Sequence, residues 1–333
     1  MVRSRFLATV LSVAALVTAC GAPARPAATR TADAQTLPDG AEAVSLLGEP
    51  LVAPELEPET RARLEADLAA ARAAFDHTPE NADSIIWLGR RLAYLGRYRE
   101  AIATFTEGIR LHPEDARLYR HRGHRHITVR QFDDAIRDLE AAAGLVRGRP
   151  DEVEPDGAPN AFGIPTSTLQ SNIWYHLALA HYLEGDFERA LPAWLECMDV
   201  SGNDDMLVAT SDWLYMTYRR LGREADAEAV LEPIHAGMRI LENDAYHRRL
   251  LMYRGEIPPD ALLAVDTDDP VQIATYGYGV GNWYLVNGDT VRAFETFRRI
   301  LEGPNWAAFG YIAAEAELSR DADARATAAP RLP

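Results

Sequence analysis

A residue pattern with a period of 34 limits the fold of this 333-residue chain more than any other feature. Three positions of residues 82–115 recur one period later, in the pairs Gly89 and Gly123, Ala101 and Ala135, and Phe105 and Leu139. A period of this length is typical of stacked helical hairpins, because one hairpin cannot bury its apolar face without neighbours. The sequence therefore predicts an all-helical repeat protein.

The unit at residues 82–115 shows why such a pattern exists. Small side chains at its glycine and alanine positions let two antiparallel helices approach, while bulky side chains fill the space beside them. Gly96 would turn the chain between the two helices, and Pro113 forbids continuation of the second. We expect the helices at residues 82–95 and 98–111.

The same spacing divides most of the chain into five to six hairpins. The predicted repeats are 82–115, 116–149, 171–204, 208–241, a degenerate unit at 242–273, and 274–303. A helix over 58–75 would cap the first repeat and a helix over 305–318 the last, because an end repeat otherwise exposes an apolar face. The predicted solenoid thus spans residues 56–319, and residues 320–333 are predicted to be a disordered tail.

The largest departure from the period falls between the second and third repeats, and a smaller one is the degenerate unit before residue 274. Ala190 lies 55 residues beyond Ala135, which is 21 more than one period. The excess falls at residues 149–169, where four prolines and four acidic residues interrupt any helical periodicity. Loops of this length without secondary structure are usually functional or disordered.

The repeat positions resemble those of tetratricopeptide repeats (TPRs), over about residues 60 to 318. This resemblance implies a right-handed α-α superhelix, a TPR solenoid, in which the first helix of each pair lines a groove that binds proteins or peptides. The positions that line the groove in such repeats give these candidate partner-binding residues: Arg90, Tyr94, Arg117, Arg120, His124, Asn172, Tyr175, Arg219, Tyr278 and Asn282.

Arginine and tyrosine often anchor protein interfaces, which favours a binding role for this groove. Two alternatives remain open at the level of sequence. The arginines could simply be a solvated concave face. Alternatively, the acidic residues of the 149–169 loop could fold over Arg120 and His124, so that the loop gates the groove. The two-carboxylate clamp of some tetratricopeptide proteins is not matched, since Ile86 and Asn172 stand where that clamp has lysine.

The first twenty residues form a distinct segment. Arg3 and Arg5 precede an apolar run over 6–17, which is shorter than the roughly 20 residues needed to span a bilayer. The run ends in small residues and Cys20, an arrangement that resembles bacterial lipoprotein signals. The resemblance implies a signal peptide at 1–19, acylation of Cys20, and an outer-membrane location on the periplasmic face. An ordinary secretory signal and an uncleaved anchor are the alternatives.

Residues 20–55 are rich in Ala, Pro, Thr and Gly, and we expect them to be a disordered tether. The net charge of −16 argues against nucleic acid as a partner. No catalytic motif, cofactor motif or convergent set of metal ligands is evident, so we expect neither an enzyme nor a cofactor or metal site. The leading hypothesis is a lipid-anchored scaffold or adaptor of the cell envelope. The alternative is a receptor for a peptide or glycan. Partner identity and oligomeric state stay open.

Overall fold

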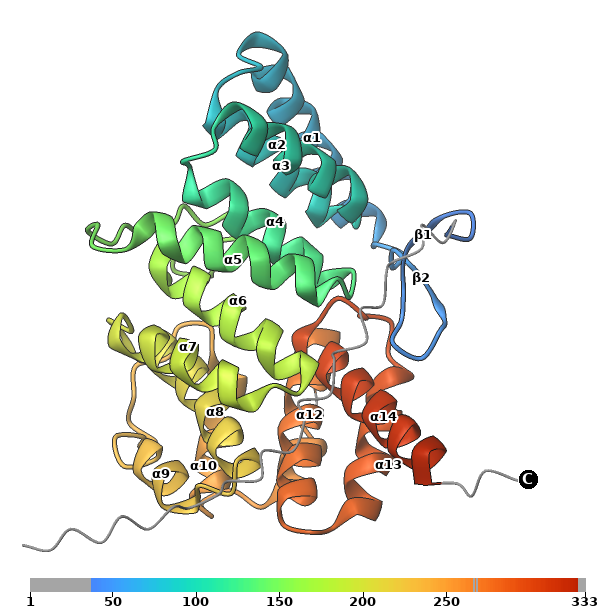
Figure 1. The fold of residues 1–333 in the computed structure, drawn as a ribbon, viewed down its shortest axis with the longest axis vertical. Coiled ribbons are helices and arrows are strands. Elements are labelled where there is room, and N and C mark those ends of the chain that lie inside the picture. The colour runs from blue at the N-terminus through green and yellow to red at the C-terminus, as the bar shows by residue number, and fades with distance from the viewer. Residues whose placement is uncertain (1–36, 266, 268, 329–333) are drawn as a thin grey trace, which may run out of the picture. The chain divides into compact units, whose positions relative to one another are not determined.

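A computed structural model describes residues 37–265, 267 and 269–328, and this part of the chain is a stack of helical hairpins (Figure 1). The predicted all-α tetratricopeptide-like solenoid is confirmed. The expected signal peptide at 1–19 and the lipid site at Cys20 lie outside the described residues. In this part the helices are α1 (Pro58–His77), α2 (Ala82–Tyr94), α3 (Tyr98–Leu111), α4 (Ala116–Thr128), α5 (Phe132–Val146), α6 (Leu169–Glu184), α7 (Phe187–Asp199), α8 (Asp204–Arg220), α9 (Glu224–Val230), α10 (Asp244–Tyr253), α11 (Pro259–Leu263), α12 (Pro270–Val286), α13 (Thr290–Leu301) and α14 (Phe309–Ala328).

The first hairpin shows how local sequence sets the elements. Asn81 caps α2 by accepting a hydrogen bond from the backbone N–H of Ser84 at 3.1 Å. Gly96 turns the chain with a φ of 76°, a conformation that glycine adopts without strain. A Cβ added to Gly89 would lie 2.4 Å from the ring of Phe105, so α2 and α3 can pack only because residue 89 is glycine.

Successive helices pack against one another from α1 to α9, as in a solenoid, and the later helices then return to earlier ones. α12 packs on α8, and α14 packs on α6 as well as on α12 and α13. Figure 1 shows α6, α12 and α14 close together. One apolar core therefore runs from Ile127 to Ala314 and fills the space that an open superhelix would leave as a groove.

The second helices of two hairpins are short: α11 in the degenerate unit at 242–273, as the sequence predicts, and α9 in the repeat at 208–241, which the sequence does not predict. α9 has seven residues and α11 five. The segment between α9 and α10 is instead held by Asp205, whose carboxylate accepts hydrogen bonds from the backbone N–H groups of Leu241, Glu242 and Asn243 at 2.9 Å each.

Two predictions about the ends of the solenoid are wrong in part. Residues 41–44 and 50–52, assigned to the disordered tether at 20–55, form an antiparallel hairpin of β1 (Ala41–Val44) and β2 (Pro50–Val52). The hairpin is stable because it docks on the C-terminal part of the chain: Trp306 Nε1 donates to the backbone oxygen of Val52 at 2.6 Å.

The tail assigned to 320–333 is also helical as far as Ala328, since α14 continues past Arg320. The Arg320 side chain donates to the backbone oxygen of Leu183 at 2.8 Å and pairs with Glu317, which holds this turn of α14 against α6. The last five residues, 329–333, lie outside the described part of the chain.

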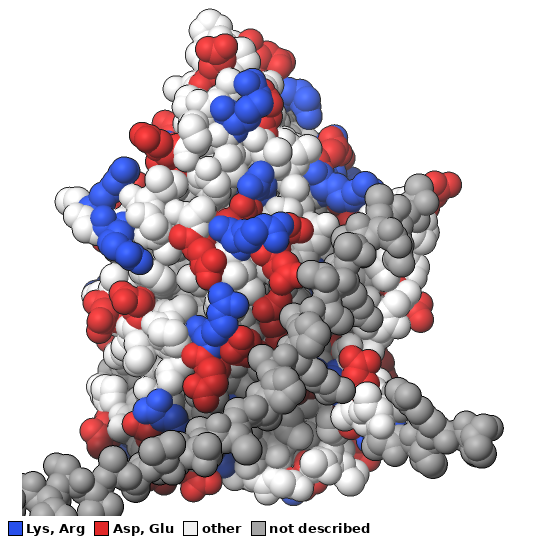
Figure 2. All heavy atoms as spheres, viewed as in Figure 1, with Lys and Arg blue, Asp and Glu red and all other residues white. Residues whose placement is uncertain are grey.

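Positive and negative side chains are mixed on the face shown in Figure 2 and do not form separate patches of one charge. Arg122 pairs with Asp138 at 2.6 Å, and Arg189 with Glu140 at 3.1 Å. None of the described helices is both long and apolar enough to cross a membrane.

Candidate binding cavity beneath the inserted loop

The loop between α5 and α6, residues 147–168, crosses from the first repeat to the segment before α10, and we call it the strap. At one end Arg90 Nη1 donates to the backbone oxygen of Pro155 at 2.7 Å. At the other, Asn160 Nδ2 donates to Glu242 Oε2 at 3.0 Å, and Thr166 also bonds to Glu242. The irregular loop predicted at 149–169 is therefore confirmed, and the structure adds that it bridges distant repeats.

Two adjoining cavities lie beneath the strap. The first, of about 270 Å³, opens toward α2 and α4, and the second, of about 320 Å³, opens toward α6, α8 and α10. Six residues line both: Arg120, His124, Thr166, Ser167, Asn172 and Glu242. Continuous concave spaces with a few convergent polar groups are the usual form of ligand sites.

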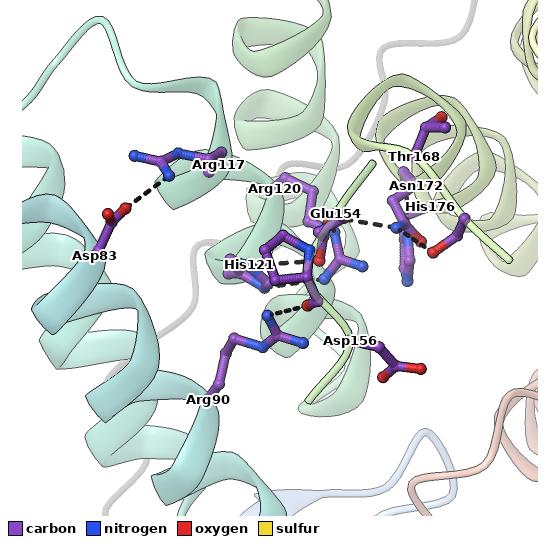
Figure 3. Close-up of polar contacts among 12 residues, drawn as sticks. Asp83, Arg90, Arg117, Arg120, His121, Glu154, Asp156, Thr168, Asn172 and His176 are labelled. Atoms are coloured by element: carbon purple, nitrogen blue, oxygen red, sulfur yellow. Dashed lines mark hydrogen bonds and ion pairs between the residues drawn. The ribbon is translucent and has the colours of Figure 1, made fainter. Parts of the chain in front are cut away.

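A carboxylate of the strap lies at the wall of the first cavity. Glu154 Oε2 lies 3.0 Å from Arg120 Nε and accepts a hydrogen bond from Asn172 Nδ2 at 3.2 Å, while Oε1 lies 3.6 Å from His121 Nε2 (Figure 3). The idea that an acidic residue of the loop folds over Arg120 is thus confirmed. It does not hold for His124, whose ring instead packs at a tilt against those of His176 and Phe309, with centroids 4.3 and 5.4 Å away.

The histidines at the cavity are neutral because the pKa values of His121, His124 and His176 lie well below the ordinary value, chiefly through burial and then through nearby arginines. Arg120 Nη1 donates to His121 Nδ1 at 2.9 Å, so the ring proton of His121 sits on Nε2, facing Glu154. His176 Nδ1 donates to the backbone oxygen of Asn172, which leaves its Nε2 as an acceptor.

Five of the predicted groove residues line the first cavity with the strap: Arg90, Tyr94, Arg120, His124 and Asn172. His124 and Tyr175 line the second cavity, where the Tyr175 hydroxyl lies 3.1 Å from that of Tyr246.

The other four predicted residues lie elsewhere. Arg117 pairs with Asp115 and Asp83 at 2.6 and 2.7 Å on an exposed edge, and Arg219 bonds to Tyr215 and Asn287. The expectation that Tyr278 and Asn282 face an open groove is wrong, because they are only 0% and 1% exposed. The superhelix closes on itself there, and Tyr278 donates instead to the Tyr182 hydroxyl at 2.8 Å.

The sequence did not indicate several residues that line the cavities. Arg125 lies outside the groove positions of the repeat, and Glu242 and Phe309 come from segments that meet the others only through the strap and the closure of the superhelix. No repeat pattern could have placed them. Within the part of the chain that the structure describes, no three His, Cys, Asp or Glu side chains gather closely enough to hold a metal ion.

No protein-family model and no curated protein matches this chain. Among solved structures it is similar to a MamA double mutant (15% identity, covering 58% of this chain and 88% of that one, TM-score 0.40). It is also similar to YrrB, described as a TPR protein with an unusual peptide-binding site (15% identity, 77% and 98% coverage, TM-score 0.40). A third is BtubC from P. vanneervenii (17% identity, 83% and 95% coverage, TM-score 0.41). At these TM-scores the likenesses add nothing about function, and the fold assignment depends on the helix pairing itself.

Proposed function

We propose that this chain is a non-catalytic scaffold that holds a protein or peptide partner in the bacterial cell envelope. The observation that carries the proposal is the bridged cavity: a stack of helical hairpins presents arginine and aromatic side chains around a concave site beneath the strap. Both residue types are enriched in protein interfaces.

A second candidate is a receptor for a compact peptide or glycan, and the strap is the reason to keep it. Arg90 and Glu242 hold the strap from opposite sides, so the space beneath it suits a ligand that the strap encloses. Closed sites of this size usually bind small molecules, whereas protein partners usually need larger and more open surfaces.

Photo-crosslinking from the cavity tests binding in either form. Ala158 is exposed on the strap and lines the first cavity, whereas Val291 is 66% exposed on α13 and lines neither cavity. A photoreactive residue at 158 should yield a discrete adduct in the native envelope, and one at 291 should not. The same adducts from both positions would place the binding surface elsewhere.

The anchor is a separate part of the proposal. We infer that Cys20 is acylated after cleavage of residues 1–19 and that the lipid holds the chain at the outer membrane, on its periplasmic face. Cys20→Ala should abolish labelling by a fatty-acid analogue and release the protein from sedimented membranes. Cys197→Ala is the matched control, since Cys197 is buried and 1% exposed. Persistent labelling of the Cys20→Ala chain would refute lipidation at this residue.

A further inference from the structure

The arginines at the first cavity are not balanced by its carboxylates. Of Arg90, Arg120 and Arg125, only Arg120 has a carboxylate within 4 Å among the described residues, and that carboxylate is Glu154. Buried or partly buried charges in proteins are normally paired, because an unpaired charge loses hydration without compensation.

The other two acids at this cavity do not supply the missing partners. Asp156 is exposed, points away from Arg90 (Figure 3), and accepts a hydrogen bond from the backbone N–H of Ala158 at 2.9 Å. Glu242 is engaged by Asn160 and Thr166, which are neutral donors.

Arg125 is the cavity arginine whose guanidinium has neither a carboxylate nor a hydrogen-bond partner among the described residues. It is partly buried, and its guanidinium makes no side-chain hydrogen bond with any described residue; its centre lies 5.6 Å from the centroid of the Tyr98 ring. Burial, together with the neighbouring Arg120 and Arg90, lowers the pKa of Arg125 to about 10. A guanidinium has five N–H donors in a fixed fork that fits a carboxylate or a phosphate.

The second cavity offers a different chemistry next to these arginines. Tyr175, His176, Tyr246 and Phe309 line it, and the His176 ring meets that of Phe309 edge-on, with centroids 5.6 Å apart. Such faces and edges accommodate a ring or another flat apolar group. The two cavities share Arg120 and His124 and therefore adjoin, so the anion-binding and ring-binding chemistries lie side by side.

We propose that the space beneath the strap binds an organic anion, in which a carboxylate or phosphate lies against Arg125 and Arg90 and an adjoining ring lies among Tyr175, Tyr246 and Phe309. This inference rests on the receptor form of the proposed function and names its ligand class. The anion supplies the partner that Arg125 lacks, and the neutral histidines line the passage between the two cavities without adding charge.

Binding of matched probes to the purified chain tests the charge requirement. N-acetyl-L-phenylalanine and phenyl phosphate carry the anion and the ring, and N-acetyl-L-phenylalaninamide lacks only the charge. Calorimetry should show that at least one of the two anions binds and that the amide binds about tenfold more weakly than the acid or not at all, since a hydrogen bond to a charged group contributes roughly that factor. A pentapeptide ending in a free phenylalanine distinguishes the source: tighter binding than the free acid identifies a chain terminus, and weaker binding a small molecule.

Arginine substitutions test where the anionic probe binds. Arg125→Met should weaken binding of the anionic probe about tenfold. The control Arg117→Met alters an arginine that lies outside both cavities and already pairs with Asp115, so it should change nothing. Arg125→Met should keep its helicity and melting temperature, because it removes an unpaired charge; if it does not fold, Arg90→Met provides the second test.

Equal binding of acid and amide, full affinity in Arg125→Met, or no binding of either anion at roughly millimolar concentration would overturn the inference. Crosslinking from residue 158 is measured in the parent chain and in the same arginine variants. An adduct that persists while the anionic probes fail leaves the scaffold standing and removes only the ligand class. Loss of the adduct with retained anion binding removes the scaffold and leaves the ligand class standing.

Discussion

At the scale of single residues, Arg130 and Glu315 join three distant parts of the chain. Their side chains meet at 2.7 Å and are 3% and 1% exposed. Arg130 also donates to the backbone oxygen of Trp306, and Glu315 accepts from the backbone N–H of Leu46 in the hairpin. Arg130 adopts a φ of 64°, rare for a residue with a side chain, which indicates that these contacts compensate for a strained backbone.

Glu315→Ala should therefore lower the free energy of unfolding by about 3–5 kcal/mol, because it leaves a buried guanidinium without its carboxylate. Urea denaturation followed by circular dichroism measures the change. Arg137→Ala breaks an exposed pair with Asp134 and serves as the control with little effect. A Glu315 variant no less stable than this control would contradict the assigned role.

The cavity histidines predict a pH dependence at the same scale. The pKa values of His124 and His176 are lower in the folded chain than in the unfolded chain, mainly through burial, so folding favours the neutral rings. Their contribution to stability is complete above the unfolded value of about 6.5 and is lost as the pH falls below it. His124→Asn/His176→Asn should thus lose less melting temperature between pH 7.5 and 5.5 than the parent chain, while a variant of the exposed His77 should behave like the parent. Parallel curves of melting temperature against pH for the parent chain, the double variant and the His77 variant would show that His124 and His176 do not cause the pH dependence.

At the scale of elements, the hairpins depend on glycine where two helices touch. A Cβ added to Gly123 would lie 2.8 Å from the Leu139 side chain, whereas one added to Gly144, also within a helix, meets nothing within 4 Å. Gly123→Ala should cost about 1–3 kcal/mol through overpacking. Gly144→Ala should stabilise the chain by up to about 1 kcal/mol, since alanine favours the helix. Thermal unfolding compares the two, and equal shifts would show that helix contact is not the reason for Gly123.

The elements also show how far the sequence predicts the fold. Helices such as α2 and α3 follow from their own residues, because Gly96 and Pro113 act within the segment that they delimit. The β1–β2 hairpin does not, since its composition resembles a linker and its stability comes from Trp306, more than 250 residues away. The continuation of α14 past residue 319 likewise involves a contact of Arg320 with another helix, which a local pattern does not show.

At the scale of the whole solenoid, closure and the strap determine what the groove becomes. The repeat pattern correctly placed Arg90, Arg120 and Asn172 around one concavity. It could not show that α14 returns to α6, which buries Tyr278, or that Phe309 contributes to the cavity. These are contacts between repeats that are far apart in the sequence, whereas a periodic pattern describes only neighbours. The loop that breaks the period is also what covers part of the groove and divides it into two concave cavities.

The strap should accordingly be held by its far end as well as by Arg90. Glu242 accepts hydrogen bonds from Asn160 and Thr166, so Glu242→Ala removes two attachments at once. Hydrogen exchange of residues 150–166 should then accelerate while the helices keep their protection, because the substituted residue lies outside every helix. Glu228→Ala alters an exposed acid on α9 and should leave exchange unchanged. If exchange of the strap is the same in both variants, the contacts to Glu242 do not hold it, and other attachments such as Asn203 Nδ2 to the backbone oxygen of Thr166 at 2.9 Å suffice.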